Sequence, residues 1–238
     1  MTIEAARELR VLGGFELRVD GRSVTPAVQG QRVLSCLAVC GPRLSRETLA
    51  GRLWPETSQA RAQANLRNAL WRLGAVAPRV VHSARGQVGL RDDVVVDLAL
   101  TEQCARQVLD DADEGRAAVL VPLALFQRDL LPGWDEEWIV PERERVRQLR
   151  IHALEALSRA CADQGRFARA VEAGLAAVNA DPLRDSANAA LIEAHLAQGN
   201  HADALRHLAG YRTLLADELG LAPSPRVENL LAVLPKAS

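Results

Sequence analysis

The spacing of hydrophobic and polar positions is most informative between Ser58 and Gly74, where it predicts an amphipathic helix. One face of this helix is apolar and carries Ala62, Leu66, Ala69, Leu70 and Leu73. The opposite face has no acidic residue and carries Arg61, Asn65, Arg67, Asn68, Trp71 and Arg72. Ser58 is a candidate N-cap, and Gly74 is a candidate end of the helix.

The absence of acids on this face is informative because exposed helices usually mix both signs of charge at spacings of three or four residues. Arginine and asparagine are the side chains that make forked hydrogen bonds to guanine and adenine in a major groove. Taken alone, the segment fits either a DNA-reading helix or a surface helix of an arginine-rich protein. The elements around it decide between these interpretations.

The segments before this helix predict a small antiparallel sheet. Leu9–Leu12 and Phe15–Val19 flank Gly13-Gly14, and Asp20-Gly21 is a tight-turn signal. Short apolar runs separated by such turns are typical of paired strands.

Two helices are predicted next. Apolar residues recur at helical spacing in Gln31–Cys40, which ends at Gly41-Pro42. Ser45 can cap a second helix that continues through Trp54, and Pro55 stops it.

Two short strands, Val80-Val81 and Val88–Leu90, follow the Arg/Asn helix and place Arg85 at the tip between them. Strands, three helices and a hairpin are, in this order, a winged helix-turn-helix with an N-terminal sheet. In that arrangement the third helix enters the major groove and the wing reaches an adjacent minor groove, where arginine is favoured. The alternative for Arg85 is an ordinary solvated turn residue.

The chain after the wing is predicted to be helical. Asp92–Leu98 is a last strand or a linker, and Thr101–Asp111 and Ala117–Phe126 show apolar helical periodicity. Arg128–Trp138 is a turn rich in tryptophan and proline, and Glu142–Gln164 is a long helix. The long helix begins with alternating charges, which favours a solvated face over a basic patch.

An internal repeat occupies the C-terminal part. The residues Ala153, Ala156, Leu157, Ala160, Gln164, Gly165, Ala168 and Ala170 recur 34 positions later as Ala187, Ala190, Leu191, Ala194, Gln198, Gly199, Ala202 and Ala204. This is the period of the tetratricopeptide repeat, a pair of antiparallel helices. A last short helix is predicted after Pro223-Ser224-Pro225 and reaches Leu234. Stacked repeats form a concave surface that binds proteins or peptides.

The predicted fold class is therefore mainly α with a small β part: a winged helix-turn-helix over residues 1–97 and an all-α, TPR-like repeat domain over residues 98–238. The charge of the chain is divided in the same way. Residues 1–97 carry 14 arginines against 9 acids, a net +5, and residues 98–238 carry a net −6. A basic half suits nucleic acid, and an acidic half suits a protein partner.

Enzymatic and metal-binding signals are missing from the sequence. There is no GxSxG, HExxH or GxxxxGK[ST] motif, so no enzyme, cofactor or ATP switch is expected. Cys36 and Cys40 lie one helical turn apart in an apolar stretch, which favours buried thiols over metal ligands. His195, His201 and His207 are six residues apart and would scatter around a helix. With no signal peptide or long apolar run, the protein is expected in the cytoplasm and not in a membrane.

The chain resembles the Streptomyces antibiotic regulatory protein family of actinobacterial transcription activators. The resemblance extends from about Leu9 to Leu231. In the N-terminal half it rests on LRVLGGFELRVDGR (9–22), LAGRLWP (49–55) and ANLRNALWRL (64–73). In the C-terminal half, which resembles that family's bacterial transcriptional activation domain, it rests on DLLPGW (129–134), NADPLRD (179–185), AHLAQGNHADALRHLAGY (194–211) and LADELGLAPSP (215–225).

This resemblance implies a winged-helix domain of the OmpR/PhoB type that binds direct repeats upstream of a promoter as two protomers side by side. It also implies recruitment of RNA polymerase through its sigma factor and alpha subunit, at the promoters of secondary-metabolite gene clusters. Asn68 and Arg72 would then face the groove, and Arg85 would be the wing tip. The full set of candidate DNA-binding residues is Arg32, Ser45, Arg46, Arg61, Asn65, Arg67, Asn68, Trp71, Arg72 and Arg85. The alternative function is a TPR-type interaction scaffold without specific DNA binding, which footprinting would distinguish.

Overall fold

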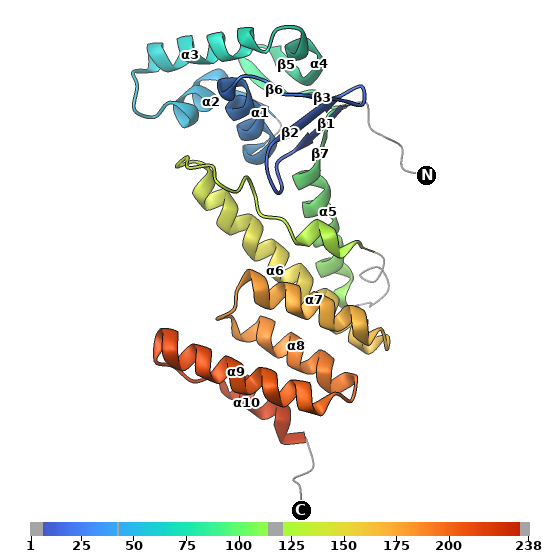
Figure 1. The fold of residues 1–238 in the computed structure, drawn as a ribbon. Helices are drawn as coiled ribbons and strands as arrows, with labels where there is room; N and C mark the ends of the chain where they lie inside the picture. The colour runs from blue at the N-terminus through green and yellow to red at the C-terminus, as the bar shows by residue number, and fades with distance from the viewer. Residues whose placement is uncertain (1–6, 42, 114–120, 234–238) are drawn as a thin grey trace, which may run out of the picture. The chain divides into compact units, whose positions relative to one another are not determined.

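The computed structural model describes residues 7–41, 43–113 and 121–233, and it divides into two compact units (Figure 1). Unit 1 comprises residues 1–102 and 128–146, and unit 2 comprises residues 103–127 and 147–238. This division differs from the boundary at residue 97 that the sequence suggests, because residues 128–146 belong to the first unit.

Unit 1 begins with a four-stranded sheet in the order β3-β2-β1-β7. Its strands are β1 (Arg7–Arg10), β2 (Glu16–Val19), β3 (Arg22–Val24) and β7 (Val95–Val96). The first three strands are antiparallel, and β7 pairs with β1 in parallel. Asp20 and Gly21 have φ angles of +51° and +74°, as a two-residue type I′ turn requires. The predicted N-terminal sheet is confirmed, and part of the segment 92–98 adds a strand to it.

Three helices and a hairpin complete the winged helix-turn-helix, which confirms the predicted fold. The helices are α1 (Val28–Cys40), α2 (Arg46–Leu53) and α3 (Gln59–Arg72). The second sheet has the order β4-β6-β5 and is built from β4 (Arg43–Ser45), β5 (Val81–Ala84) and β6 (Gln87–Leu90). A 3-10 turn, η1 (Gly74–Val76), and the short α4 (Ala77–Val80) connect α3 to β5. The sequence had suggested that the strand begins at Val80. In the structure Val80 ends α4, and β5 begins at Val81.

The distant segment 128–146 is an integral part of unit 1. The N–H of Gly13 donates to the carbonyl of Asp129 at 2.7 Å, and that of Leu131 donates to the carbonyl of Val11 at 2.8 Å. The segment supplies the unit's core with Leu130, Leu131, Ile139 and Val146. The tryptophan- and proline-rich turn predicted for residues 128–138 thus pairs with residues 11–13, directly after β1.

A partly buried ion pair joins this segment to the helix-turn-helix. Arg32 on α1 donates to both carboxylate oxygens of Glu136, from Nε at 2.6 Å and from Nη2 at 3.0 Å. The same guanidinium donates to the carbonyl of Leu53 at 2.6 Å and lies 5.6 Å from the ring centroid of Trp54. Trp138 Nε1 donates to Glu136 at 2.6 Å. These contacts join the end of α2, the middle of α1 and the segment 128–146.

Unit 2 is built from antiparallel helices, two of which, α5 and α6, start in unit 1. The elements are α5 (Asp97–Asp110), η2 (Asp111–Asp113), η4 (Leu123–Phe126), α6 (Ile139–Asp163), α7 (Phe167–Ala180), α8 (Asp185–Ala197), α9 (His201–Leu219), α10 (Pro225–Asn229) and η5 (Leu230–Val233). In Figure 1, α7, α8 and α9 lie in successive antiparallel rows.

The internal repeat corresponds to two helical hairpins, α6–α7 and α8–α9. Gly165 and Gly199 start the two turns with φ angles of +72° and +79°. The backbone N–H of Arg166 bonds to Cys161 at 2.8 Å, and that of Asn200 bonds to His195 at the same distance. Most of the repeated residues are buried, namely Ala153, Leu157, Ala160 and Ala170 with their counterparts Ala187, Leu191, Ala194 and Ala204, whereas Ala168 and Ala202 are exposed. A Cβ added at Gly174 on α7 would lie 3.0 Å from the Leu191 backbone on α8. The TPR-like architecture is confirmed.

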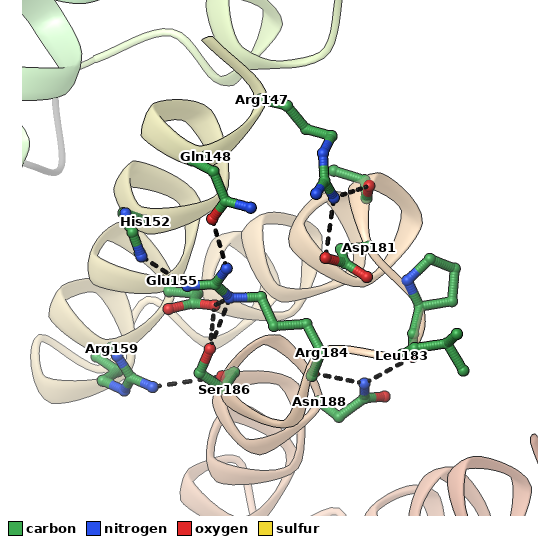
Figure 2. Close-up of polar contacts among 12 residues, drawn as sticks. Arg147, Gln148, His152, Glu155, Arg159, Asp181, Leu183, Arg184, Ser186 and Asn188 are labelled. Carbon is green, nitrogen blue, oxygen red and sulfur yellow. Dashed lines mark hydrogen bonds and ion pairs between the residues drawn. The ribbon is translucent and has the colours of Figure 1, made fainter. Parts of the chain in front are cut away.

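A polar network joins the first helices of the two hairpins, α6 and α8 (Figure 2). Arg184 donates to Gln148 at 2.7 Å and to Glu155 at 3.0 Å, and its Nη2 lies 2.6 Å from His152 Nε2. Ser186 also donates to Glu155, at 2.7 Å. Because the Glu155 side chain is only 7% exposed, its charge requires these partners. The guanidinium of Arg184 is therefore held by contacts within unit 2.

Several predicted helices differ in extent from the observed ones; the helix predicted over residues 101–111, for example, is observed as Asp97–Asp110. The first helix of the chain begins at Val28, three residues before the predicted start, and α6 begins at Ile139 with Pro141 tolerated in its first turn. Of the predicted helix 117–126, residues 117–120 lie outside the described residues. Its end, Leu123–Phe126, is a 3-10 helix. Likewise, Leu234 lies outside the described residues, and the last short helix ends before it.

Replacing Glu136 with glutamine should destabilise unit 1, because it removes the carboxylate that holds the partly buried Arg32 guanidinium. We expect a loss of about 1–3 kcal/mol, the range for hydrogen bonds to charged groups. All four tryptophans lie in unit 1, so denaturant unfolding followed by tryptophan fluorescence reports on this unit. Glu137→Gln changes an exposed neighbouring carboxylate and is the matched control. Equal midpoints for the two variants would contradict this role of the ion pair.

Candidate nucleic-acid interface

The apolar face of α3 fixes the helix on unit 1. Ala62, Leu66, Ala69 and Leu73 are between 1% and 5% exposed and pack into the core. The approach of α1 is close at Gly30, where an added Cβ would lie 2.6 Å from Leu73 Cδ2. At the start of α3, Gln59 Nε2 donates to Glu47 of α2 at 2.8 Å. These contacts leave the opposite face of α3 directed to solvent.

The polar face of α3 is exposed, in agreement with its pattern. Arg61, Arg67, Asn68, Trp71 and Arg72 are exposed, and Asn65 is half-buried. Trp71 is 81% exposed, which is rare for a side chain with this much apolar area. Within the described ranges, none of the three arginines of this face forms an ion pair. Their charge and donors are thus available to a ligand.

Three of these polar side chains lie on one strip of α3, because positions 65, 68 and 72 are spaced by three and four residues. Asn65, Asn68 and Arg72 line a shallow depression of about 250 Å³ together with Gln29 and Trp54. The sequence did not single out Gln29 and Trp54. Trp54, at the end of α2, is partly buried and packs against the core of unit 1 while it also lines this depression.

The hairpin β5–β6 forms the wing. Its tip residues, Arg85 and Gly86, are exposed and have φ angles of +50° and +78°, as a type I′ turn requires. Arg46 ties the wing to the start of α2: its backbone N–H donates to the carbonyl of Gly86 at 2.9 Å, and its Nη2 donates to Ser83 at 2.9 Å. The wing and the helix-turn-helix are thus held together on one unit.

Two of the candidate DNA-binding residues have internal roles in the structure. Arg32 donates hydrogen bonds to Glu136 and to the carbonyl of Leu53, so its nitrogens are not available to DNA. We therefore leave Arg32 out of the candidate interface. Ser45 caps α2, since its Oγ accepts the N–H of Thr48 at 2.9 Å. By contrast, Ser58 at the start of α3 makes no side-chain capping bond.

The histidines considered in the sequence lie on two helices, not one. His195 is on α8, and His201 and His207 are on α9, where His207 Nε2 lies 2.9 Å from Asn188 Oδ1. Burial lowers the pKa of His207. No group of three or more metal-ligating side chains occurs among the described residues, and no helix there has the length and hydrophobicity needed to cross a membrane.

A winged helix-turn-helix with an unpaired arginine face, followed by paired helical repeats, defines a class of transcription regulators. The model of the family "Bacterial transcriptional activator domain" matches residues 93–234, which is more than half of the chain. The chain belongs to this family, and it is a regulator of the Streptomyces antibiotic regulatory protein type. This is a family of transcription regulators, not of enzymes.

Individual relatives agree with this assignment. The chain is 31% identical over 232 residues to the regulatory protein AfsR of Streptomyces coelicolor and 27% identical over 233 residues to AfsR of Streptomyces griseus. The matches cover 92% and 93% of this chain but only 23% of each relative. The chain therefore spans about a quarter of the length of these curated relatives.

The fold is also found in a solved structure, Mycobacterium tuberculosis EmbR in complex with a low affinity phosphopeptide. The TM-score is 0.77 at 22% identity, and the match covers 98% of this chain and 67% of that chain. At this identity, the similarity shows the fold.

Replacement by alanine should have a small effect on stability at Trp71 and a large one at Leu66, because Trp71 lies on the exposed face of α3 and Leu66 on its buried face. Trp71→Ala should change the unfolding free energy of unit 1 by less than about 0.5 kcal/mol. Leu66→Ala should cost roughly 2–5 kcal/mol through lost burial and a cavity. Urea unfolding of the full chain measures both. A large loss for Trp71→Ala would mean that its ring is packed and not free for a ligand.

Proposed function

We propose that unit 1 binds duplex DNA in a sequence-dependent manner, with α3 in the major groove and Arg85 at the adjacent minor groove. The observation that carries this proposal is the exposed, acid-free face of α3, whose arginines make no ion pair within the described ranges. The partly buried Arg32, by contrast, is paired, with its Nε 2.6 Å from Glu136. Unpaired arginines with asparagines beside them have the donors and acceptors that base edges require.

The residues of the interface divide into base-reading and backbone-contacting sets. Asn65, Asn68 and Arg72 form one strip of α3 and are assigned to base edges. The other exposed residues of the helix, Arg61, Arg67 and Trp71, are assigned to the flanking backbone and sugars. Arg85 and Arg46 extend the contact from the wing and from the start of α2.

Unit 2 is proposed to recruit RNA polymerase holoenzyme through its sigma factor and alpha subunit, and to align a second protomer on a direct-repeat operator upstream of a promoter. Two observations support this role: the match to the activator-domain family over residues 93–234 and the net charge of −6 over residues 98–238. An acidic repeat surface suits a basic protein surface. Secondary-metabolite gene clusters are the proposed targets, and the protein would act in the cytoplasm without a cofactor.

Substitution of Arg72 should distinguish base reading from backbone contact. Duplexes selected from a randomised pool by the full chain provide the operator. On this operator, Arg72→Ala should cost about 1–3 kcal/mol and relax the preference at one or two base pairs. Arg85→Ala should weaken binding with less effect on base preference, and it should reduce the salt dependence of the affinity.

Arg79→Ala is the control for this comparison, because Arg79 is an exposed arginine already paired with Asp20. It should leave affinity and preference nearly unchanged. An equal loss on all sequences for Arg72→Ala would assign that residue to phosphate. A full chain that selects no sequence from the pool would instead favour the scaffold function.

Truncation after Val146 should separate DNA binding from activation, because it keeps residues 128–146 in unit 1 and removes residues 147–238. We expect the truncated chain to bind a single half-site weakly and to lose activation in transcription with purified holoenzyme. Binding to the half-site shows that unit 1 is still folded. A truncated chain that activates as well as the full chain would refute recruitment by unit 2.

A further inference from the structure

Two cysteines lie in contact in the last turn of α1. Cys36 is fully buried in the core of unit 1, and Cys40, the last residue of the helix, is half-buried. The S–H of Cys36 is directed at Cys40, with 3.8 Å between the two Sγ atoms. The proposed DNA-binding function uses neither thiol.

The surroundings of the pair distinguish its two members chemically. The hydrogen bond from Cys36 lowers the pKa of Cys40 to about 7; burial opposes this shift, and the guanidinium of Arg52 on α2 adds to it. The same hydrogen bond, together with burial, raises the pKa of Cys36. Cys40 is therefore the more acidic and the more accessible thiol of the pair, and Cys36 is the buried neutral thiol. Burial raises the pKa of Cys161 in unit 2.

We propose that Cys40 is an oxidation site for hydroperoxides and that Cys36 is its resolving thiol. The Cys40 thiolate attacks one oxygen of hydrogen peroxide, the O–O bond breaks, and hydroxide leaves, so that Cys40 becomes a sulfenic acid. The thiol of Cys36 then attacks the Cys40 sulfur, and the S–OH bond breaks. The proton of Cys36 leaves with the hydroxyl as water, and a disulfide between residues 36 and 40 remains. Two electrons pass from the thiol pair to the peroxide.

The helix can accommodate this bond at its end. Residues four apart in an α-helix have Cα atoms about 6 Å apart, which is within the range that disulfides span. The two sulfurs must approach from 3.8 Å to a bond length of about 2.05 Å. Because α1 ends at Cys40 and Gly41 follows with a φ of +127°, only the last turn has to shift.

This shift would reach the elements that surround α3. Two residues after Gly41 the chain enters β4, which pairs with the wing strand β6 between Arg43 and Gly89 and between Ser45 and Gln87. Ser45 also caps α2. A displaced last turn of α1 therefore pulls on the wing and on the N-terminus of α2. If unit 1 binds DNA as proposed, oxidation lowers its affinity for the operator.

The chemistry is tested on the full chain with hydrogen peroxide at neutral pH, followed by alkylation and peptide mass spectrometry. We expect an intramolecular disulfide between residues 36 and 40, with the loss of two hydrogen atoms in mass. In Cys36→Ser, a dimedone-type trap should label Cys40, whereas in Cys40→Ser residue 36 should stay reduced. Cys161→Ser should behave like the wild type.

Alkylation of the reduced chain at neutral pH is a second measurement. Cys40 should be alkylated roughly tenfold faster than an ordinary thiol, since its thiolate fraction is higher.

The outcomes separate this proposal from the DNA-binding proposal. Oxidation of Cys104 or Cys161 before Cys40, or a disulfide only between chains, overturns the assigned site whether or not the protein binds DNA.

The affinity for DNA tests the regulatory consequence. The oxidised wild type should bind the selected operator on the order of tenfold more weakly, and dithiothreitol should restore its affinity. The affinity of the double variant Cys36→Ser/Cys40→Ser should not change with peroxide. A disulfide that leaves the affinity unchanged overturns the regulatory consequence alone. A reduced chain that binds no duplex refutes the DNA-binding proposal. The peptide mass spectrometry of the peroxide-treated chain then still tests the thiol chemistry.

Discussion

The ion pair between Arg32 and Glu136 is the contact on which the rest of unit 1 depends, because it joins positions 104 residues apart in sequence. Its guanidinium also bonds to the last residue of α2 and lies over Trp54, so α1, α2 and the segment 128–146 share one set of hydrogen bonds. The two side chains are about one-fifth exposed, where an unpaired charge is costly. The scaffold that holds α3 is therefore discontinuous in sequence. The family model, which begins at residue 93, includes part of it.

The arginines of this chain have two physically distinct uses. In unit 2, Arg147 pairs with Asp181 and Arg184 pairs with Glu155 (Figure 2). Arg159 on α6 pairs with Glu193 on α8, so these arginines join neighbouring hairpins. On α3 and at the wing tip, arginines project without an acidic partner within the described ranges. The composition alone gives no distinction between these groups. The pairing in the folded structure does, and it identifies the surface from which the proposed DNA contact is argued.

Local periodicity was enough to predict α3 and the repeated hairpins, because each buries one regular stripe of its own residues. The segment 128–138 has no such periodicity, and its partner strand lies more than 100 residues earlier in the sequence. Sequence reasoning therefore treated it as a connecting turn. Arg32 was included among the candidate DNA-binding residues, and its partner Glu136, 104 positions later in the sequence, is brought to it only by folding. The site residues of α3 followed from their pattern, whereas Gln29 and Trp54 became apparent only once the chain was folded.

Native-state hydrogen exchange of the full chain tests most directly whether the segment 128–146 belongs to unit 1. Peptides from α1 and from residues 128–146 should open with the same free energy and should lose protection together as denaturant is added, because they share one core and one ion pair. Exchange of residues 128–146 through a separate opening of much lower free energy, with α1 unaffected, would contradict the account.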